Sequence, residues 1–184
     1  MATFGKTTTS GSYDNDGGGN QRGSKFVLTE EGNLSKISMH SRVGSAGSVN
    51  VKCGIFLDNG SNTPTTFKGA TNAVAISNTT AQWNDFTFAT ELYLPAATYW
   101  IVWLSESNTL YHQFNADALT NGHAYAGATY PNFTDPFGTP SYQNWEVSIY
   151  ATYTAGGPPT SIFLDMWVPK TNQPYLEKEG MVNY

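Results

Sequence analysis

Hydrophobic residues at every second position recur along this chain of 184 residues, and almost no segment repeats at the 3.6-residue period of an α-helix. The pattern is clearest over residues 49–57, where one face carries Val49, Val51, Cys53, Ile55 and Leu57. A second such face runs over residues 145–153, with Trp145, Val147, Ile149, Ala151 and Tyr153. Both segments predict strands with one buried and one polar face, which is typical of an antiparallel sheet.

Residues 99–104 read Tyr-Trp-Ile-Val-Trp-Leu, a run that is apolar on both faces. Such a run predicts a central strand that is covered from two sides or buried at an interface. Weaker strand candidates are residues 3–8, 25–28, 34–41, 67–76, 83–88 and 110–114. About eight strands with turn signals between them, and no crossover helices, predict an all-β fold, an antiparallel β-sandwich of jelly-roll type.

The composition narrows the classes of partner. Charged residues make up 12% of the chain, the formal net charge is −5, and aromatic residues reach 14%. Nucleic-acid binding calls for clustered Lys and Arg, which the sequence lacks, so we expect no nucleic-acid partner. No apolar run approaches the roughly 18 residues of a transmembrane helix, and no secretory leader is visible. We therefore expect no membrane contact, and synthesis in the cytoplasm unless a leader has been removed.

Metal ligands are sparse in the sequence. Asp14 and Asp16 carry the oxygen ligands that calcium prefers, but an EF-hand loop starting at Asp14 would need a Glu where Lys25 stands. We expect no bound cofactor, keep Asp14 and Asp16 as calcium candidates, and interpret residues 10–20 as a flexible loop too glycine-rich for a strand. Cys53 is the single cysteine, so no intramolecular disulfide forms. The three histidines are interpreted as ordinary ones, because none has a Cys or carboxylate nearby at the spacing of a metal site. They are His40, His112 and His123.

No motif predicts catalysis. The sequence has no Gly-x-Ser-x-Gly nucleophile elbow. Glycoside hydrolysis needs two carboxylates across a cleft, and nothing in the spacing pairs the scattered acids Asp85, Glu91, Glu106, Asp117, Asp135 and Glu146. We therefore expect a protein that is not an enzyme, and a glycan-degrading activity ranks last among the hypotheses.

A loop predicted over residues 126–144 is rich in rings, with Tyr130, Phe133, Phe137 and Tyr142 among Gly and Pro. Loops of this length are functional or disordered. In one interpretation the rings stack on sugar rings while Asn and Thr bind the hydroxyls. In the other, which we favour, they pin the loop onto the edge of the sandwich.

The composition changes at residues 155–159, Ala-Gly-Gly-Pro-Pro, which resembles a linker. We predict a sandwich domain over residues 1–154, and a linker with an extended C-terminal arm over residues 155–184. Residues 161–168 alternate again but are apolar on both faces, and such a strand needs a partner. It either folds back as an edge strand or, as we expect, docks on another subunit through Ile162, Phe163, Leu164, Met166 and Trp167.

Four short segments of the chain, taken together, resemble a known family. They are residues 2–7 (Ala-Thr-Phe-Gly-Lys-Thr), 22–26 (Arg-Gly-Ser-Lys-Phe), 97–101 (Ala-Thr-Tyr-Trp-Ile) and 148–154 (Ser-Ile-Tyr-Ala-Thr-Tyr-Thr). Together they resemble a family of Gly- and Thr-rich jelly-roll modules of phage virion proteins and bacterial surface proteins, over residues 2–154. In surface proteins such modules repeat in tandem after a signal peptide. One copy without a leader favours the virion branch, which includes capsid decoration proteins and appendage proteins.

The resemblance and the arm together predict a non-enzymatic structural protein of the virion. In this hypothesis it is a capsid decoration, or cement, protein on the capsid exterior, assembled in the host cytoplasm. It forms a homo-oligomer, expected to be a trimer, and braces neighbouring capsid subunits. The alternative is a carbohydrate-binding or host-adhesion module of a phage tail or cell-surface protein, with a glycan as partner of the rings in residues 126–144.

Overall fold

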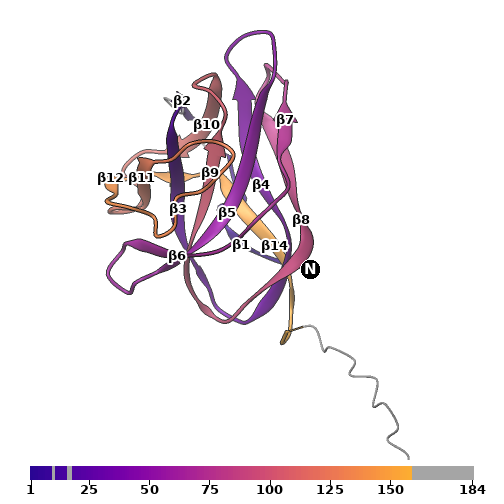
Figure 1. Ribbon diagram of the computed structural model, residues 1–184, viewed down its shortest axis with the longest axis vertical. Helices are drawn as coiled ribbons and strands as arrows, with labels where there is room; N and C mark the ends of the chain where they lie inside the picture. The colour runs from indigo at the N-terminus through magenta and orange to yellow at the C-terminus, as the bar shows by residue number, and fades with distance from the viewer. Residues whose placement is uncertain (10, 16–17, 159–184) are drawn as a thin grey trace, which may run out of the picture.

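Two antiparallel sheets pack face to face in the computed structural model, which describes residues 1–9, 11–15 and 18–158 (Figure 1). Sheet A has the order β1 (Ala2–Gly5), β14 (Ile149–Ala155), β4 (Gly32–Val43), β10 (Leu110–Asn115) and β13 (Glu146–Val147). Two further strands join it: β2 (Ser12–Asn15) pairs with β10, and β8 (Gln82–Leu94) pairs with β4.

Sheet B has the order β12 (Ser141–Gln143), β11 (His123–Gly127), β3 (Asn20–Leu28), β9 (Ala97–Ser105), β5 (Val49–Asp58) and β6 (Pro64–Ala70). A short strand, β7 (Val74–Ile76), also pairs with β5. No helix occurs in the described ranges. The predicted all-β antiparallel sandwich is therefore confirmed, while its jelly-roll subtype stays a prediction.

Strand β9 explains why residues 99–104 are apolar on both faces. It lies between β3 and β5, and all six of these residues are fully buried. Tyr99, Ile101 and Trp103 point into the core between the sheets. Trp100 and Val102 point the other way, into a second apolar cluster on the outer side of sheet B. The prediction of a central strand covered from two sides is confirmed.

The strand predicted over residues 145–153 is broken into β13 and β14 at Ser148. The Ser148 N–H donates to the Gln113 carbonyl (2.9 Å), and its own carbonyl accepts from the His40 N–H (2.9 Å). The alternation survives the break, because Val147, Ile149, Ala151 and Tyr153 all belong to the core between the sheets.

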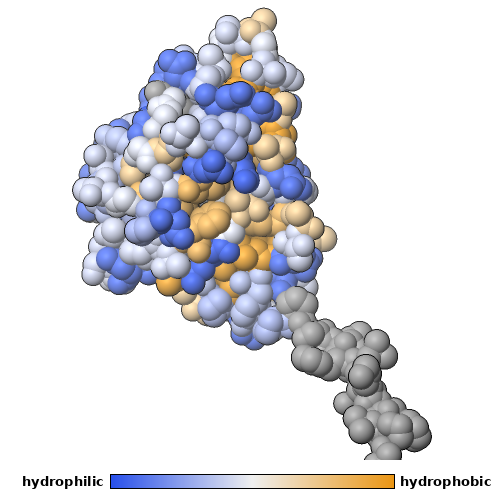
Figure 2. Space-filling model, viewed as in Figure 1, coloured by the Kyte–Doolittle hydropathy of each residue, from blue (hydrophilic) through white to orange (hydrophobic). Residues whose placement is uncertain are grey.

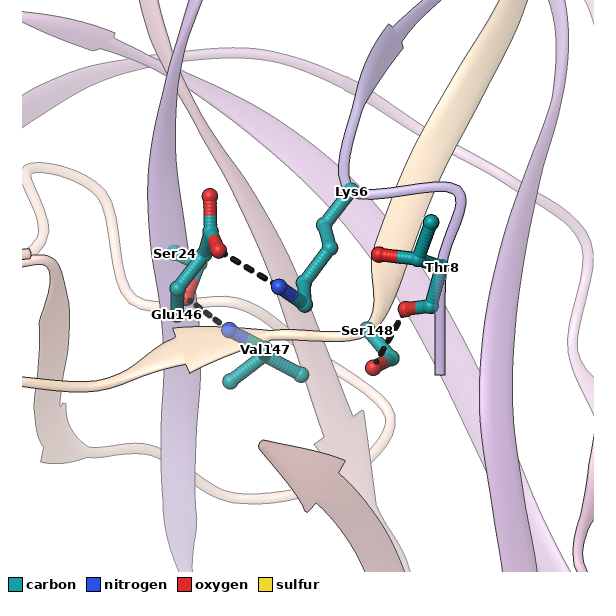
Figure 3. A network of polar contacts seen from close by, with 6 residues as sticks. All are labelled: Lys6, Thr8, Ser24, Glu146, Val147 and Ser148. Carbon is teal, nitrogen blue, oxygen red and sulfur yellow. Dashed lines mark hydrogen bonds and ion pairs between the residues drawn. The ribbon is translucent and has the colours of Figure 1, made fainter. Parts of the chain in front are cut away.

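A polar network fastens this break to both sheets (Figure 3). Lys6 Nζ lies 2.6 Å from Glu146 Oε2, in a partly buried ion pair. The Ser148 hydroxyl donates to the Thr8 carbonyl (3.0 Å). The Val147 N–H donates to Ser24 Oγ on β3 (3.1 Å), which links β13 to sheet B. In sheet A, β1 pairs with β14 so that Ala2 stands opposite Tyr153.

Three segments differ from the predictions. Residues 10–20 were expected to be too glycine-rich for a strand, but Ser12–Asn15 pairs with β10 as β2, because its glycines lie on either side of these four residues. Residues 67–76 form β6 and β7 rather than one strand. Residues 126–144 are not all loop, since β11 extends to Gly127 and β12 lies within them. Strand β11 was not predicted.

The last strand of the sandwich ends next to the residues predicted as a linker, and the division into a domain and an arm stays a prediction. Strand β14 ends at Ala155, and the Gly156 N–H still donates to the Glu31 carbonyl (3.1 Å). The anchoring residues predicted in the arm, Ile162, Phe163, Leu164, Met166 and Trp167, lie outside the described residues. The C-terminal arm therefore stays a prediction.

Two buried imidazoles lie between the sheets at the β10 and β11 end of the core. The rings of His112 and His123 are 6.0 Å apart, and Trp103 lies 4.7 Å from the first and 5.8 Å from the second. Burial, followed by the proximity of His112 and Arg22, holds the pKa of His123 well below its ordinary value of 6.5, and Gln143 offsets part of this effect.

We expect the free energy of unfolding to fall as the pH drops below 6.5. In that range the unfolded chain protonates His123 and the folded chain does not, so this site lowers stability by up to about 1.4 kcal/mol per pH unit. Urea unfolding measured between about pH 7 and pH 5, above the titration of most carboxylates, tests this. His123→Phe should reduce this dependence and leave the smaller part due to His40, whose pKa burial also lowers. An unchanged slope in that variant would contradict the assignment.

Candidate functional site

Strand β4 presents a polar row on the side of sheet A that faces away from the core. Its alternate residues Ile37, Met39 and Val43 are buried in the core. The outward row consists of Lys36, Ser38, His40 and Arg42. The register places Trp83 opposite His40, and Asp85 and Tyr150 on either side of Ser38. We call this the outer face of sheet A: Lys36, Ser38, His40, Arg42, Trp83, Asp85, Tyr111, Gln113, Tyr150 and Tyr13.

Two aromatic rings meet above β4 on this face. Trp83 comes from β8 and Tyr150 from β14, the strands on opposite sides of β4. Their ring centroids are 5.0 Å apart in an edge-to-face arrangement, and Trp83 packs in the same way against His40 at 5.2 Å. Both Trp83 and Tyr150 remain partly exposed. The register therefore creates an aromatic surface that solvent can reach.

A charged pair lies beside these rings. Lys36 Nζ is 2.6 Å from Asp85 Oδ2, and the Ser38 hydroxyl donates to Asp85 Oδ1 at 2.5 Å. Burial opposes ionisation of Asp85, but the hydrogen bonds from Lys36 and Ser38 outweigh it and lower the pKa of the carboxyl. The pair is half-exposed, so the carboxylate and the ammonium both keep hydrogen-bonding capacity toward a ligand.

The other end of the face is built around Arg42. Its guanidinium carbon lies 4.6 Å from the ring centroid of Tyr111 and 5.5 Å from that of Tyr13. The Tyr13 hydroxyl accepts a hydrogen bond from Gln113 Nε2 (3.2 Å). A Cβ at Gly44 would come within 2.5 Å of the Tyr111 ring, so a glycine is needed beside this ring.

His40 joins the two ends of the outer face. It lies on β4 between Ser38 and Arg42 and is almost completely buried beneath its neighbours. Burial lowers its pKa below the ordinary 6.5, and Gln113 offsets part of this effect. The ring is therefore neutral at pH 7, so it adds no charge to the face.

The four loop rings predicted as glycan-stacking residues are not presented as one platform. Phe137 is 1% exposed and packs edge-on against Phe56 at 5.1 Å, so its ring is not available to a ligand. Phe133 stacks on Phe67 at 5.5 Å, and the Tyr142 hydroxyl is 3.0 Å from the Thr63 hydroxyl. Tyr130 is partly exposed.

These contacts agree with the interpretation in which the rings pin the loop. The loop runs over β3 and β9, and apolar residues gather in the middle of the same face (Figures 1 and 2). The buried Gln21 side chain on β3 fastens it further. Gln21 donates to the Phe137 carbonyl (2.9 Å) and accepts from the Thr134 N–H (2.9 Å). The loop thus covers Trp100 and Val102 on the outer side of sheet B, while Phe67, Phe133 and Tyr142 remain partly exposed there.

The calcium candidates have different positions. Asp14 lies on β2 with a carboxylate oxygen 3.6 Å from Arg22, while Asp16 lies outside the described residues. Within the described residues, no three His, Cys, Asp or Glu side chains are grouped so as to hold a metal ion.

One pocket lies between the β4–β5 and β9–β10 loops. It is lined by hydroxyl-bearing residues such as Ser45, Ser48 and Thr109 and has a volume of about 170 Å³. Sites for small organic ligands usually have volumes of roughly 300 Å³ or more. This pocket is therefore small for such a ligand.

No protein-family model matches the chain, and no curated protein shows a significant match to it. Within the described ranges, no helix is both long and apolar enough to cross a membrane.

Sequence reasoning did not single out the outer face. The strand that carries it was predicted, and the polar alternation of Lys36, Ser38, His40 and Arg42 was the available signal. Trp83 and Tyr150 are distant in the sequence, so their contact follows from the strand order alone.

We expect Phe137→Ala to lower the free energy of unfolding by about 3 kcal/mol or more, because it removes a buried ring and leaves a cavity. The matched change Tyr130→Ala, at a partly exposed ring of the same loop, should cost less than half as much. Urea unfolding of both variants compares them. Equal losses would show that Phe137 does not pin the loop.

Proposed function

We propose that this protein is a non-catalytic binding module that holds carbohydrate on the outer face of sheet A. The observation that carries the proposal is the partly exposed ring pair of Trp83 and Tyr150 directly beside the Lys36–Asp85 ion pair. A sugar ring has an apolar C–H face and an edge of hydroxyl groups. The exposed face of one aromatic ring next to charged hydrogen-bonding groups complements both parts.

The spacing of these groups suits a sugar. Trp83 and Asp85 are two residues apart on the same face of β8, so their Cα atoms are about 7 Å apart. That distance is comparable to the width of one pyranose ring with its hydroxyls. A ring stacked on Trp83 therefore places its hydroxyls within reach of the Asp85 carboxylate and the Lys36 ammonium.

The same groups argue for binding without hydrolysis. Glycoside hydrolysis usually needs two carboxylates across a cleft, but Asp85 is paired with Lys36, and Glu146 on the same side of sheet A is paired with Lys6. The lowered pKa of Asp85 also keeps it ionised at neutral pH, so it is a poor general acid. Its fitting role is that of a hydrogen-bond acceptor for hydroxyl groups.

Glycan binding should depend on this face rather than on the loop over residues 126–144. We expect Trp83→Ala to weaken binding at least about tenfold, because it removes a large stacking surface. Asp85→Asn, which keeps the shape of the side chain, should weaken it as well. Both are compared with wild type on a glycan array and by titration calorimetry.

Tyr130→Ala is the matched control, since it removes a partly exposed ring from the loop. We expect it to leave glycan affinity within about twofold of wild type, because the loop lies on the other sheet. Thermal unfolding shows whether each variant is folded. Binding that is lost in Tyr130→Ala and kept in Trp83→Ala would move the site to the loop.

A second proposal concerns the arm. We propose that the chain beyond residue 158 attaches the sandwich to another subunit, as in a capsid decoration protein. The support is the two-faced apolar pattern of residues 161–168, with the family resemblance over residues 2–154. The two proposals are compatible, because the arm would anchor the module while the outer face of sheet A remains free to bind.

Truncation after residue 158 should abolish self-association or capsid binding and leave the sandwich folded. The cut is placed there because the Gly156 N–H bonds to Glu31, and Asn33 Nδ2 donates to the Gly157 carbonyl (3.0 Å). Light scattering measures the mass with and without residues 159–184, and circular dichroism monitors the fold. A truncated protein that assembles like the full chain would refute the proposed role of the arm.

A further inference from the structure

We propose that Arg42 makes the outer face of sheet A selective for acidic sugars, those that carry a carboxylate or sulfate group. This inference rests on the carbohydrate binding proposed above and specifies its ligand class.

The neighbouring cations already have carboxylate partners. Lys36 pairs with Asp85 and Lys6 with Glu146, each at 2.6 Å, and Arg22 pairs with Asp14 at 3.6 Å. Within the described residues, no carboxylate oxygen lies within ion-pair distance of Arg42, whose hydrogen bond goes to the Val43 carbonyl (3.2 Å). A guanidinium has five N–H donors, so most of those of Arg42 remain for a ligand.

The guanidinium is also held in place before any ligand arrives. The rings of Tyr111 on β10 and Tyr13 on β2 contact it, with centroids at 4.6 and 5.5 Å. Gly44 gives the Tyr111 ring room, and Gln113 donates a hydrogen bond to the Tyr13 hydroxyl. A stacked guanidinium loses little side-chain freedom when it binds an anion, which favours a bidentate contact.

Arg42 and Trp83 share the outer face but lie on different sides of His40: Trp83 comes from β8, and the rings that hold the guanidinium come from β10 and β2, across β4. Arg42 is two residues from His40 on the same face of β4, a distance of about 7 Å, and Trp83 stands opposite His40 on the adjacent strand. A sugar chain that stacks on Trp83 and crosses β4 above His40 therefore brings the acidic substituent of a following unit toward the guanidinium.

The net charge of −5 does not prevent this selectivity. At physiological ionic strength, charges more than about 8 Å from a bound ligand are largely screened. The charges of the outer face itself therefore determine whether an acidic ligand is attracted. Lys36 and Asp85 offset each other, and the lowered pKa of His40 keeps that ring neutral at pH 7. Arg42 is left as the local excess positive charge.

The test uses the full chain and an array in which each acidic glycan stands beside a neutral counterpart. One pair is an oligogalacturonate and its methyl ester, and another is a sulfated oligosaccharide and its desulfated form. Wild type should prefer the acidic member of a pair about tenfold or more, as expected for a charge-assisted contact. Which pair shows the preference distinguishes a carboxylate ligand from a sulfate ligand.

Arg42→Gln should abolish this preference, and Lys68→Gln is the matched control. The control makes the same charge change on an exposed residue of sheet B, so it should leave the preference unchanged. If neutral glycans bind as well as acidic ones and Trp83→Ala abolishes this binding, the carbohydrate proposal stands and the acidic preference is overturned. If no glycan binds to wild type, both are overturned.

Discussion

Burial of β9 on both faces is the constraint on which the rest of the structure depends. Its residues 99–104 are fully buried, so each face of the strand needs its own cover. Sheet A covers Tyr99, Ile101 and Trp103, which makes the fold a sandwich. The loop over residues 126–144 covers Trp100 and Val102, which occupies the outer side of sheet B. The outer face of sheet A has no such loop over its Trp83 and Tyr150 rings, which are both partly exposed.

The strands that carry most of the buried surface were predictable from the sequence. Residues 49–57 alternate between apolar and polar residues, and residues 99–104 are apolar on both faces. Both patterns follow directly from the geometry of a buried strand. The elements that were not predicted lack such a pattern and depend on contacts with other strands. Strand β2 is polar and exists by pairing with β10, β11 contains small residues, and the break at Ser148 depends on hydrogen bonds to two other strands.

The candidate site was less predictable, for a physical reason. Its rings come from β8, β14, β10 and β2, and the register that unites them is set by residues on the opposite, buried side of each strand. The four loop rings attracted attention because they are clustered in the sequence. Phe137 shows why such clustering misleads: aromatic residues in a long loop also serve to bury themselves and hold the loop.

The pairing of β1 with β14 places the first and last strands of the sandwich side by side. Ala2 stands opposite Tyr153, so the two points where the polypeptide enters and leaves the sandwich are separated by roughly one interstrand spacing, about 5 Å. Domains with such adjacent ends tolerate circular permutation and insertion into a surface loop of a host protein. The sandwich can therefore be linked through both β1 and β14 to one larger protein without distortion of either strand.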